Sequence, residues 1–217
     1  TRYWRDWSSD VCSSDLKSLT APSADPLDRE HNEGWPGGRF NHYWFDPNRD
    51  WLPLVHPEAQ ARAEFYHRWR PHVAADFHEM GSDTTYFFQP GIPTRNNPSI
   101  PAEVVALHER IATFHREAFD AAGVLYFSRE RFDDFYAGKG STYPDLHGSV
   151  GILFEQASSR GHAQDTPHGL LTFPITIRNQ VLTSLSTLKA AATLRADLLR
   201  QQRSFARDTA AAAAASK

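Results

Sequence analysis

The sequence predicts an α/β fold in which a mixed β-sheet is flanked by helices, and three observations support this. A helical pattern at 56–71 is followed directly by a strand pattern at 72–80. A long amphipathic helix follows at 101–123, and a continuous apolar strand is expected at 149–158. Alternating strands and helices of these lengths are typical of α/β proteins.

The first helix is predicted from its end signals. Pro57 suits the first turn of a helix, because it has no N–H group to leave unpaired there, and Glu58 suits the positive end of the helix dipole. Pro71 stops the helix, and the strand that follows ends in "DFHEM".

The second helix is the clearest of the chain. Its apolar residues recur at helical spacing and Gly123 suits its C-terminal cap. The apolar residues are Val104, Val105, Leu107, Ile111, Phe114, Ala118 and Phe119. We expect a further strand or extended stretch at 85–90, a mobile loop at 129–148 and a long helix from 173 to about 196.

The ends of the chain need separate treatment. Residues 1–16 have no helical or strand periodicity and read as translated sequencing adaptor or as a disordered tail, so we leave them out of the fold prediction. They contain Cys12, the only cysteine, so no disulfide framework is expected in the rest. Residues 17–34 are expected to be irregular, and 197–217 to be a helical or frayed tail. We expect the fold to be truncated at its N-terminus and at its C-terminus.

Composition argues against two classes of partner. The formal net charge is −3 and the basic residues are scattered, which argues against nucleic acid. No run of 18 apolar residues is present, so no membrane span is predicted.

Three polar residues each allow two readings when taken alone. His78 ends a strand and is either a structural histidine or a metal ligand. Glu155 follows the apolar run "VGILF" and is either a general base or the partner of Arg160 in an ion pair. Arg49 either binds a carboxylate or pairs with one of the aspartates that flank it at 46 and 50.

Taken in order, these residues resemble a known family. The series Arg39, "DPNRDW", "DFHEMG", "FYAGKGSTYPD" and "LFEQAS" is similar to the second part of the catalytic domain of zinc carboxypeptidases, in particular a bacterial branch. The resemblance covers about residues 35–190, and it implies that 35–196 is a partial metallocarboxypeptidase catalytic domain.

The resemblance implies a role for each matching residue. Asn48 and Arg49 would bind the C-terminal carboxylate of the substrate, and His78 would be the third zinc ligand. Glu155 would be the general base. Arg39 would stabilise the oxyanion, with Arg29 as the alternative. The tyrosine that closes over bound substrate on a flexible loop would be Tyr136, with Tyr143 as the alternative.

The implied chemistry is peptide hydrolysis. Zn²⁺ with three protein ligands keeps one position for water, and a glutamate moves the proton from that water to the leaving amine. The family's first two zinc ligands lie in an upstream His-x-x-Glu motif that is not found before Asn48, so we expect the chain itself to be inactive.

The implied partner is a peptide with a free C-terminus. Two other functions stay open: a zinc deacylase that acts on N-acyl amino acids, and a non-catalytic relative that only binds. The resemblance favours a periplasmic or secreted location, and nothing in the sequence predicts the oligomeric state.

Overall fold

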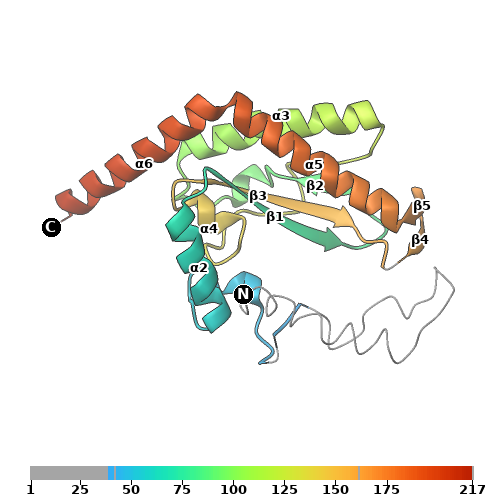
Figure 1. Cartoon of the computed structure of the whole chain (residues 1–217), viewed down its shortest axis with the longest axis horizontal. Helices are drawn as coiled ribbons and strands as arrows, with labels where there is room; N and C mark the ends of the chain where they lie inside the picture. The colour runs from blue at the N-terminus through green and yellow to red at the C-terminus, as the bar shows by residue number, and fades with distance from the viewer. Residues whose placement is uncertain (1–38, 42, 161, 217) are drawn as a thin grey trace.

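The computed structural model describes residues 39–41, 43–160 and 162–216. The expectations for residues 1–16, for residues 17–34 and for Arg29 concern positions outside the described residues. In the described part the predicted α/β architecture is confirmed: a mixed sheet is covered by helices (Figure 1). No described helix has both the length and the apolar character needed to cross a membrane.

The main sheet has three strands, β1 (Val73–Met80), β2 (Tyr86–Phe88) and β3 (Val150–Ala157), in the order β1-β3-β2. β1 and β3 are parallel and β2 is antiparallel to β3, so the sheet is mixed, as predicted. A separate hairpin of β4 (Ala163–Thr166) and β5 (Gly169–Thr172) was not predicted.

The helices include α2 (Pro57–Trp69), which begins at Pro57 and ends where Arg70 adopts a left-handed conformation. α3 (Ala102–Ala122) ends at Gly123, whose φ of 63° is the left-handed cap predicted from the sequence. Short turns of helix are η3 (Pro47–Arg49), η4 (Pro93–Arg95) and α4 (Thr142–Asp145). α4 lies inside the segment expected to be a mobile loop, which is therefore partly helical.

The long C-terminal helix differs from the expectation. It is two helices, α5 (Phe173–Thr193) and α6 (Arg195–Ala215), which join at Leu194. α6 leads away from the body of the molecule (Figure 1). Residues 124–128 form no strand and contribute only an isolated bridge between Phe127 and Phe87.

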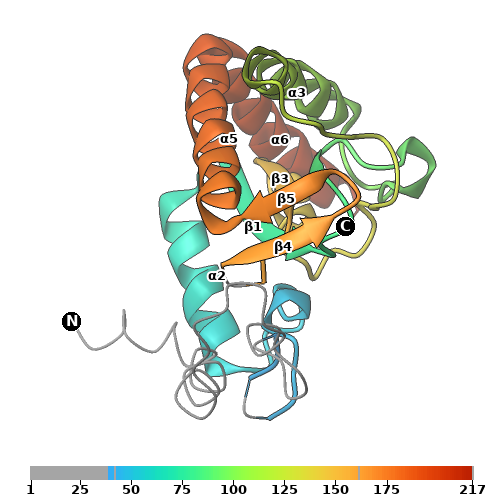
Figure 2. The ribbon, with the colours of Figure 1, turned by 90° about the vertical axis from the view of Figure 1, so that its right-hand side faces the viewer.

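The core lies between one face of the sheet and the helices α3 and α5 (Figures 1 and 2). Phe88 and Phe154 from adjacent strands are fully buried there and contact His115 of α3 in edge-on ring packing. Burial of each large apolar side chain stabilises the fold by roughly 2 kcal/mol. This face anchors the sheet, and Asp76, His78 and Glu155 lie on the opposite face.

Candidate functional site

The polar face of the sheet brings His78 and Glu155 together. The register of the parallel β1–β3 pair sets His78 directly opposite Glu155, and Asp76 opposite Leu153. Adjacent strands lie about 4.8 Å apart, and directly paired residues project from the same face. The expectation that these two strands lie side by side with both residues at one edge is therefore confirmed.

The imidazole of His78 is held by an acidic partner on its own strand. Its Nε2 lies 2.7 Å from Oδ1 of Asp76. Burial on its own would lower the pKa of His78, but the hydrogen bond and charge of Asp76, together with the charge of Glu155, raise it above its usual value. The same burial would raise the pKa of Asp76, and the hydrogen bonds from His78 and Asn48 lower it. The contact with Asp76 therefore fixes the orientation of the His78 ring.

The other ring nitrogen of His78, Nδ1, forms no hydrogen bond with any residue that the structure describes. Histidines that bind metals usually donate their second N–H to a carboxylate, which fixes the ring and leaves the first nitrogen for the ion. The sequence contained the signal for this: in Asp-x-His on a strand both side chains lie on one face. Sequence reasoning did not pair them.

Glu155 has the electrostatics of a proton acceptor. Burial raises its pKa to about 7, and the charge of Asp76 adds to this effect, while His78, Arg39 and Arg131 oppose it. A carboxylate with a pKa near neutral pH both accepts and returns protons efficiently. No ion pair between Glu155 and Arg160, the alternative reading, is found among the described residues.

Asn48 joins the segments around the site. Its Oδ1 accepts hydrogen bonds from Trp51 Nε1 (3.1 Å) and from the backbone N–H of Gly140 (2.8 Å). Its Nδ2 donates to Oδ2 of Asp76 (3.0 Å) and lies 3.0 Å from Nε2 of His78. The amide of Asn48 is thus occupied within the protein, which differs from the expected free donor for a substrate carboxylate.

Gly140 allows this close approach. A Cβ atom at that position would lie 2.7 Å from Oδ2 of Asp76 and 3.0 Å from Oδ1 of Asn48. Only a glycine lets the 129–148 segment reach the Asp76–Asn48 pair without displacing it. The segment is therefore anchored to the sheet at this point.

The two arginines lie at the rim. Arg39 Nε bonds to Asp46 Oδ2 at 2.8 Å, and its side chain is half-exposed. Its positive charge acts to lower the pKa of both His78 and Glu155. Arg49 Nη1 donates to the carbonyl of Asn48 at 2.9 Å and forms no ion pair with the flanking aspartates in the described structure.

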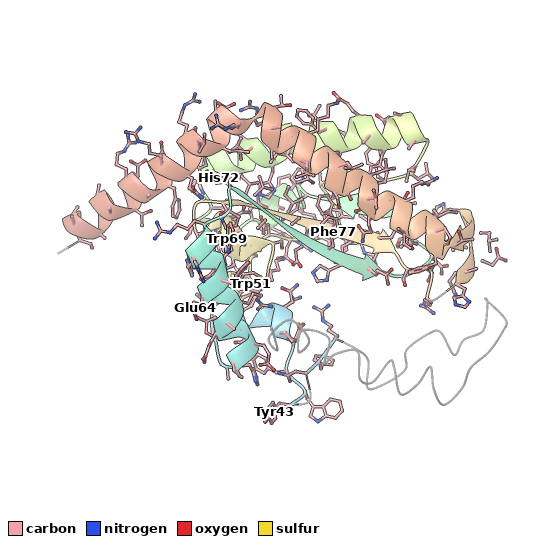
Figure 3. All side chains as sticks on the ribbon, in the orientation of Figure 1. Tyr43, Trp51, Glu64, Trp69, His72 and Phe77 are labelled. Carbon is pink, nitrogen blue, oxygen red and sulfur yellow. The ribbon has the colours of Figure 1, made fainter. Side chains whose placement is uncertain are left out.

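The structure separates the two candidate tyrosines. Tyr136 is exposed, and its hydroxyl donates to the carbonyl oxygen of Arg49 at 3.1 Å. Tyr143 is buried in α4, where its hydroxyl meets His67 Nε2 at 2.6 Å and its ring stacks on His147. Trp51 packs against this group beside α2 (Figure 3). Tyr143 thus belongs to a packed aromatic cluster, and the expectation that it is a second candidate for a closing tyrosine does not fit this position.

A second cluster of ionisable groups was missed by sequence reasoning. His108 of α3 lies 3.0 Å from Oδ2 of the fully buried Asp145, and Asp134 lies close by. Burial raises the pKa of Asp145 to about 8, while the charge and hydrogen bond of His108 oppose this. The one feature of the sequence that could have indicated this cluster was His108, which lies on the apolar face of the helix predicted at 101–123.

A metal ion at His78 would need further ligand atoms close to the imidazole ring. In the described part of the chain, the group of three or more ligand residues whose atoms converge is His108, Asp134 and Asp145, whose ligand atoms lie within 4.8 Å of one another. No such group includes His78. A catalytic zinc site needs three protein ligands. The described residues therefore fit one part of such a site, and do not complete it.

No protein-family model matches the sequence. A search of the curated proteins likewise finds no match.

Solved structures do match. A metallo-carboxypeptidase from Burkholderia cenocepacia superposes with a TM-score of 0.53 at 16% identity, over 72% of this chain and 40% of that one. A metallo-carboxypeptidase from Pseudomonas aeruginosa, in complex with (2-guanidinoethylmercapto)succinic acid, superposes with a TM-score of 0.53 at 19% identity, over 75% and 43%. The chain thus spans about two fifths of the length of these two proteins. Over the part that matches, this chain has the α/β fold of the bacterial metallo-carboxypeptidases.

Proposed function

We propose that this chain carries the general-base part of the active site of a zinc-dependent carboxypeptidase-type peptidase. One observation carries the proposal: a glutamate with a pKa of about 7 lies opposite a carboxylate-oriented histidine on the neighbouring strand. The fold that the chain shares with two metallo-carboxypeptidases supports the same class of enzyme.

Glu155 is the group that moves protons. As a carboxylate it accepts a proton from the attacking water, and as the acid it returns that proton to the amine that leaves when the peptide bond breaks. A pKa of about 7 makes both steps favourable near neutral pH. Zinc, when bound, supplies Lewis acidity at the scissile carbonyl and lowers the pKa of the attacking water.

The other residues bind and orient. Asp76 holds the ring of His78, so that Nδ1 is available as a ligand. Arg39 faces the negative charge that develops on the carbonyl oxygen. Arg49 binds the free carboxylate of the peptide, and Asn48 positions it by supporting η3 from the sheet. Tyr136, bonded to the backbone of Arg49, closes over the substrate.

The described residues supply one zinc ligand, so the chain alone is proposed to bind zinc weakly and to lack peptidase activity. The test therefore uses an enzyme in which the chain is expressed together with the coding sequence that precedes it in its genome. Peptides with free and with amidated C-termini are compared. Selective cleavage of the free form, lost by a factor of about 10²–10⁴ in Glu155→Gln, supports the proposal.

Glu79→Gln is the matched control, since Glu79 is an exposed glutamate on the neighbouring position of the same sheet and should leave the rate unchanged. Equal cleavage of both peptides would refute a carboxypeptidase. Cleavage of N-acyl amino acids in place of peptides would identify a deacylase, and binding without turnover would identify a non-catalytic relative.

A further inference from the structure

One arginine of α2 is turned toward the candidate site. The side chain of Arg62 is partly buried, whereas Arg68 on the same helix and Arg70 at its end are exposed. The Nε atom of Arg62 is buried and forms no hydrogen bond with any residue that the structure describes. Burial of a charged group is costly unless nearby groups compensate for it, so the surroundings of Arg62 must supply that compensation.

Arg62 holds the short turn η3 from the side of α2. Its Nη2 donates to the carbonyl oxygen of Pro47, the first residue of η3, at 2.8 Å. Its guanidinium carbon lies 4.1 Å from the centre of the Trp51 ring, which is a close cation–π contact. Figure 3 shows Trp51 beside α2. Arg62 therefore contacts the chain both at the start of η3 and two residues beyond its end.

These two contacts lie next to the residues proposed to bind substrate. Trp51 Nε1 donates to Oδ1 of Asn48 at 3.1 Å, and Arg49 is the next residue along η3. None of the three residues of η3 is buried, so the turn has no apolar core of its own to fix its position. Its position depends on contacts from outside, and in the described structure Arg62 supplies the hydrogen bond that comes from α2.

Three carboxylates compensate for the buried charge of Arg62. Burial lowers the pKa of the guanidinium, and the negative charges of Asp76, Asp50 and Asp46 oppose this effect. Asp76 belongs to β1, Asp50 follows η3, and Asp46 caps it. Within the part of the chain that the structure describes, Arg62 forms no direct ion pair with any of them. It is thus a counter-charge shared between the sheet and the segment 46–51.

We propose that Arg62 is a positioning residue of the candidate site: it fixes the segment 46–51 so that Arg49 meets the C-terminal carboxylate of the substrate. This role rests on the proposed function, which assigns that carboxylate to Arg49. Arg62 acts on substrate binding and not on proton transfer, because its contacts are with the binding segment, whereas Glu155 lies on β3. A group displaced by about 1 Å can cost about a factor of 10².

The first test needs neither metal nor substrate. Arg62→Met removes the charge and the donors and keeps an apolar stem beside Trp51. Hydrogen exchange is measured by NMR on the full chain. It should become at least about tenfold faster at the indole N–H of Trp51 and the backbone N–H of Asp50, which are both bonded within the segment 46–51. The N–H of Val150, at the start of β3, is the internal reference and should change less than about twofold.

Arg68→Met is the matched control, because Arg68 is an exposed arginine of the same helix. It should leave all three exchange rates within about twofold of wild type. Unchanged rates at Trp51 and Asp50 in Arg62→Met would overturn the proposal. Equal acceleration at Val150 would also overturn it, because the effect would then be a loss of global stability. If Arg62→Met fails to fold, Arg62→Lys gives the same test, since a lysine cannot reproduce a planar fork that donates and stacks at once.

The second test uses the enzyme extended by its upstream coding sequence and a peptide with a free C-terminus. Arg62→Met should raise KM at least about fivefold and change kcat less than about twofold, and Arg68→Met should change neither. An unchanged KM, with or without a lower kcat, would overturn the proposal, because a residue that positions the binding segment must act on binding. Absence of peptidase activity in the wild-type extended enzyme would refute the proposed function, and the exchange rates of the full chain would still decide whether Arg62 fixes the segment 46–51.

Discussion

Replacing Glu155 by glutamine should change how the stability of the chain depends on pH, and this can be measured without metal, substrate or activity. Burial raises the pKa of Glu155 from 4.5 to about 7 in the folded chain. Between these values the unfolded chain has lost the proton and the folded chain keeps it. The free energy of unfolding therefore falls as pH rises through this window, and below pH 4.5 Glu155 has no such effect. Glutamine does not titrate, so Glu155→Gln should remove this part of the decline.

The size of the effect follows from the shift. One pKa unit corresponds to about 1.4 kcal/mol, so a shift from 4.5 to about 7 sets an upper limit of about 3 kcal/mol. Glu155 is partly exposed, and solvent screening reduces this figure. We expect Glu155→Gln to gain about 1–2 kcal/mol of stability relative to wild type when pH rises from 4.5 to 8.

The assay is urea unfolding of both proteins at several pH values, followed by tryptophan fluorescence. Glu79→Gln serves as the control for removing a charge from the same sheet. Parallel stability curves for wild type and Glu155→Gln would show that Glu155 titrates normally, and would refute its assignment as a general base tuned by burial.

Three further predictions follow from the geometry. Zinc should raise the melting temperature of the chain by less than about 2 °C, because His78 is its single described ligand at this site; a larger shift that His78→Ala removes would contradict this. Asp145→Asn should lower the free energy of unfolding by about 1–3 kcal/mol in urea titrations, because an amide cannot reproduce both the hydrogen bond to His108 and the one accepted from the backbone N–H of Gly151; an unchanged free energy of unfolding would argue against a structural role for these bonds. In the extended enzyme Tyr136→Phe should raise KM severalfold and leave most of kcat, since Glu155 still transfers the proton; unchanged kinetics would exclude a closing role.

Much of the fold could be predicted because its signals are local. Pro57 and Gly123 mark helix ends through their own backbone preferences, and α2 and α3 lie within two residues of the predicted ranges. The break between α5 and α6 was not predictable in the same way, because Leu194 is a good helix former. The side of α5 that faces the core could not be predicted either. Its buried polar side chains contact Gln156, Tyr86 and His115, which come from other elements.

One part of the candidate site, the meeting of His78 and Glu155, could be predicted from the order of the strands along the chain. The pairing of β1 with β3 follows from two apolar strands, and it brings His78 opposite Glu155. The state of Asn48 could not be predicted, because its amide bonds depend on Gly140, which lies far along the chain. Tyr143 and Tyr136 look alike in the sequence, and only tertiary packing buries the first and exposes the second.

The β1–β3 register also determines when a site can exist during folding. Paired residues of these strands, such as His78 and Glu155, lie roughly 80 residues apart in the chain, and contacts of such long range form late and slowly. α2 and α3 are local and can form before this step. The two residues therefore meet only when the chain between them, which contains β2 and α3, closes into a loop. A molecule that has lost this pairing has lost the site completely, so the site and the native state appear and disappear together.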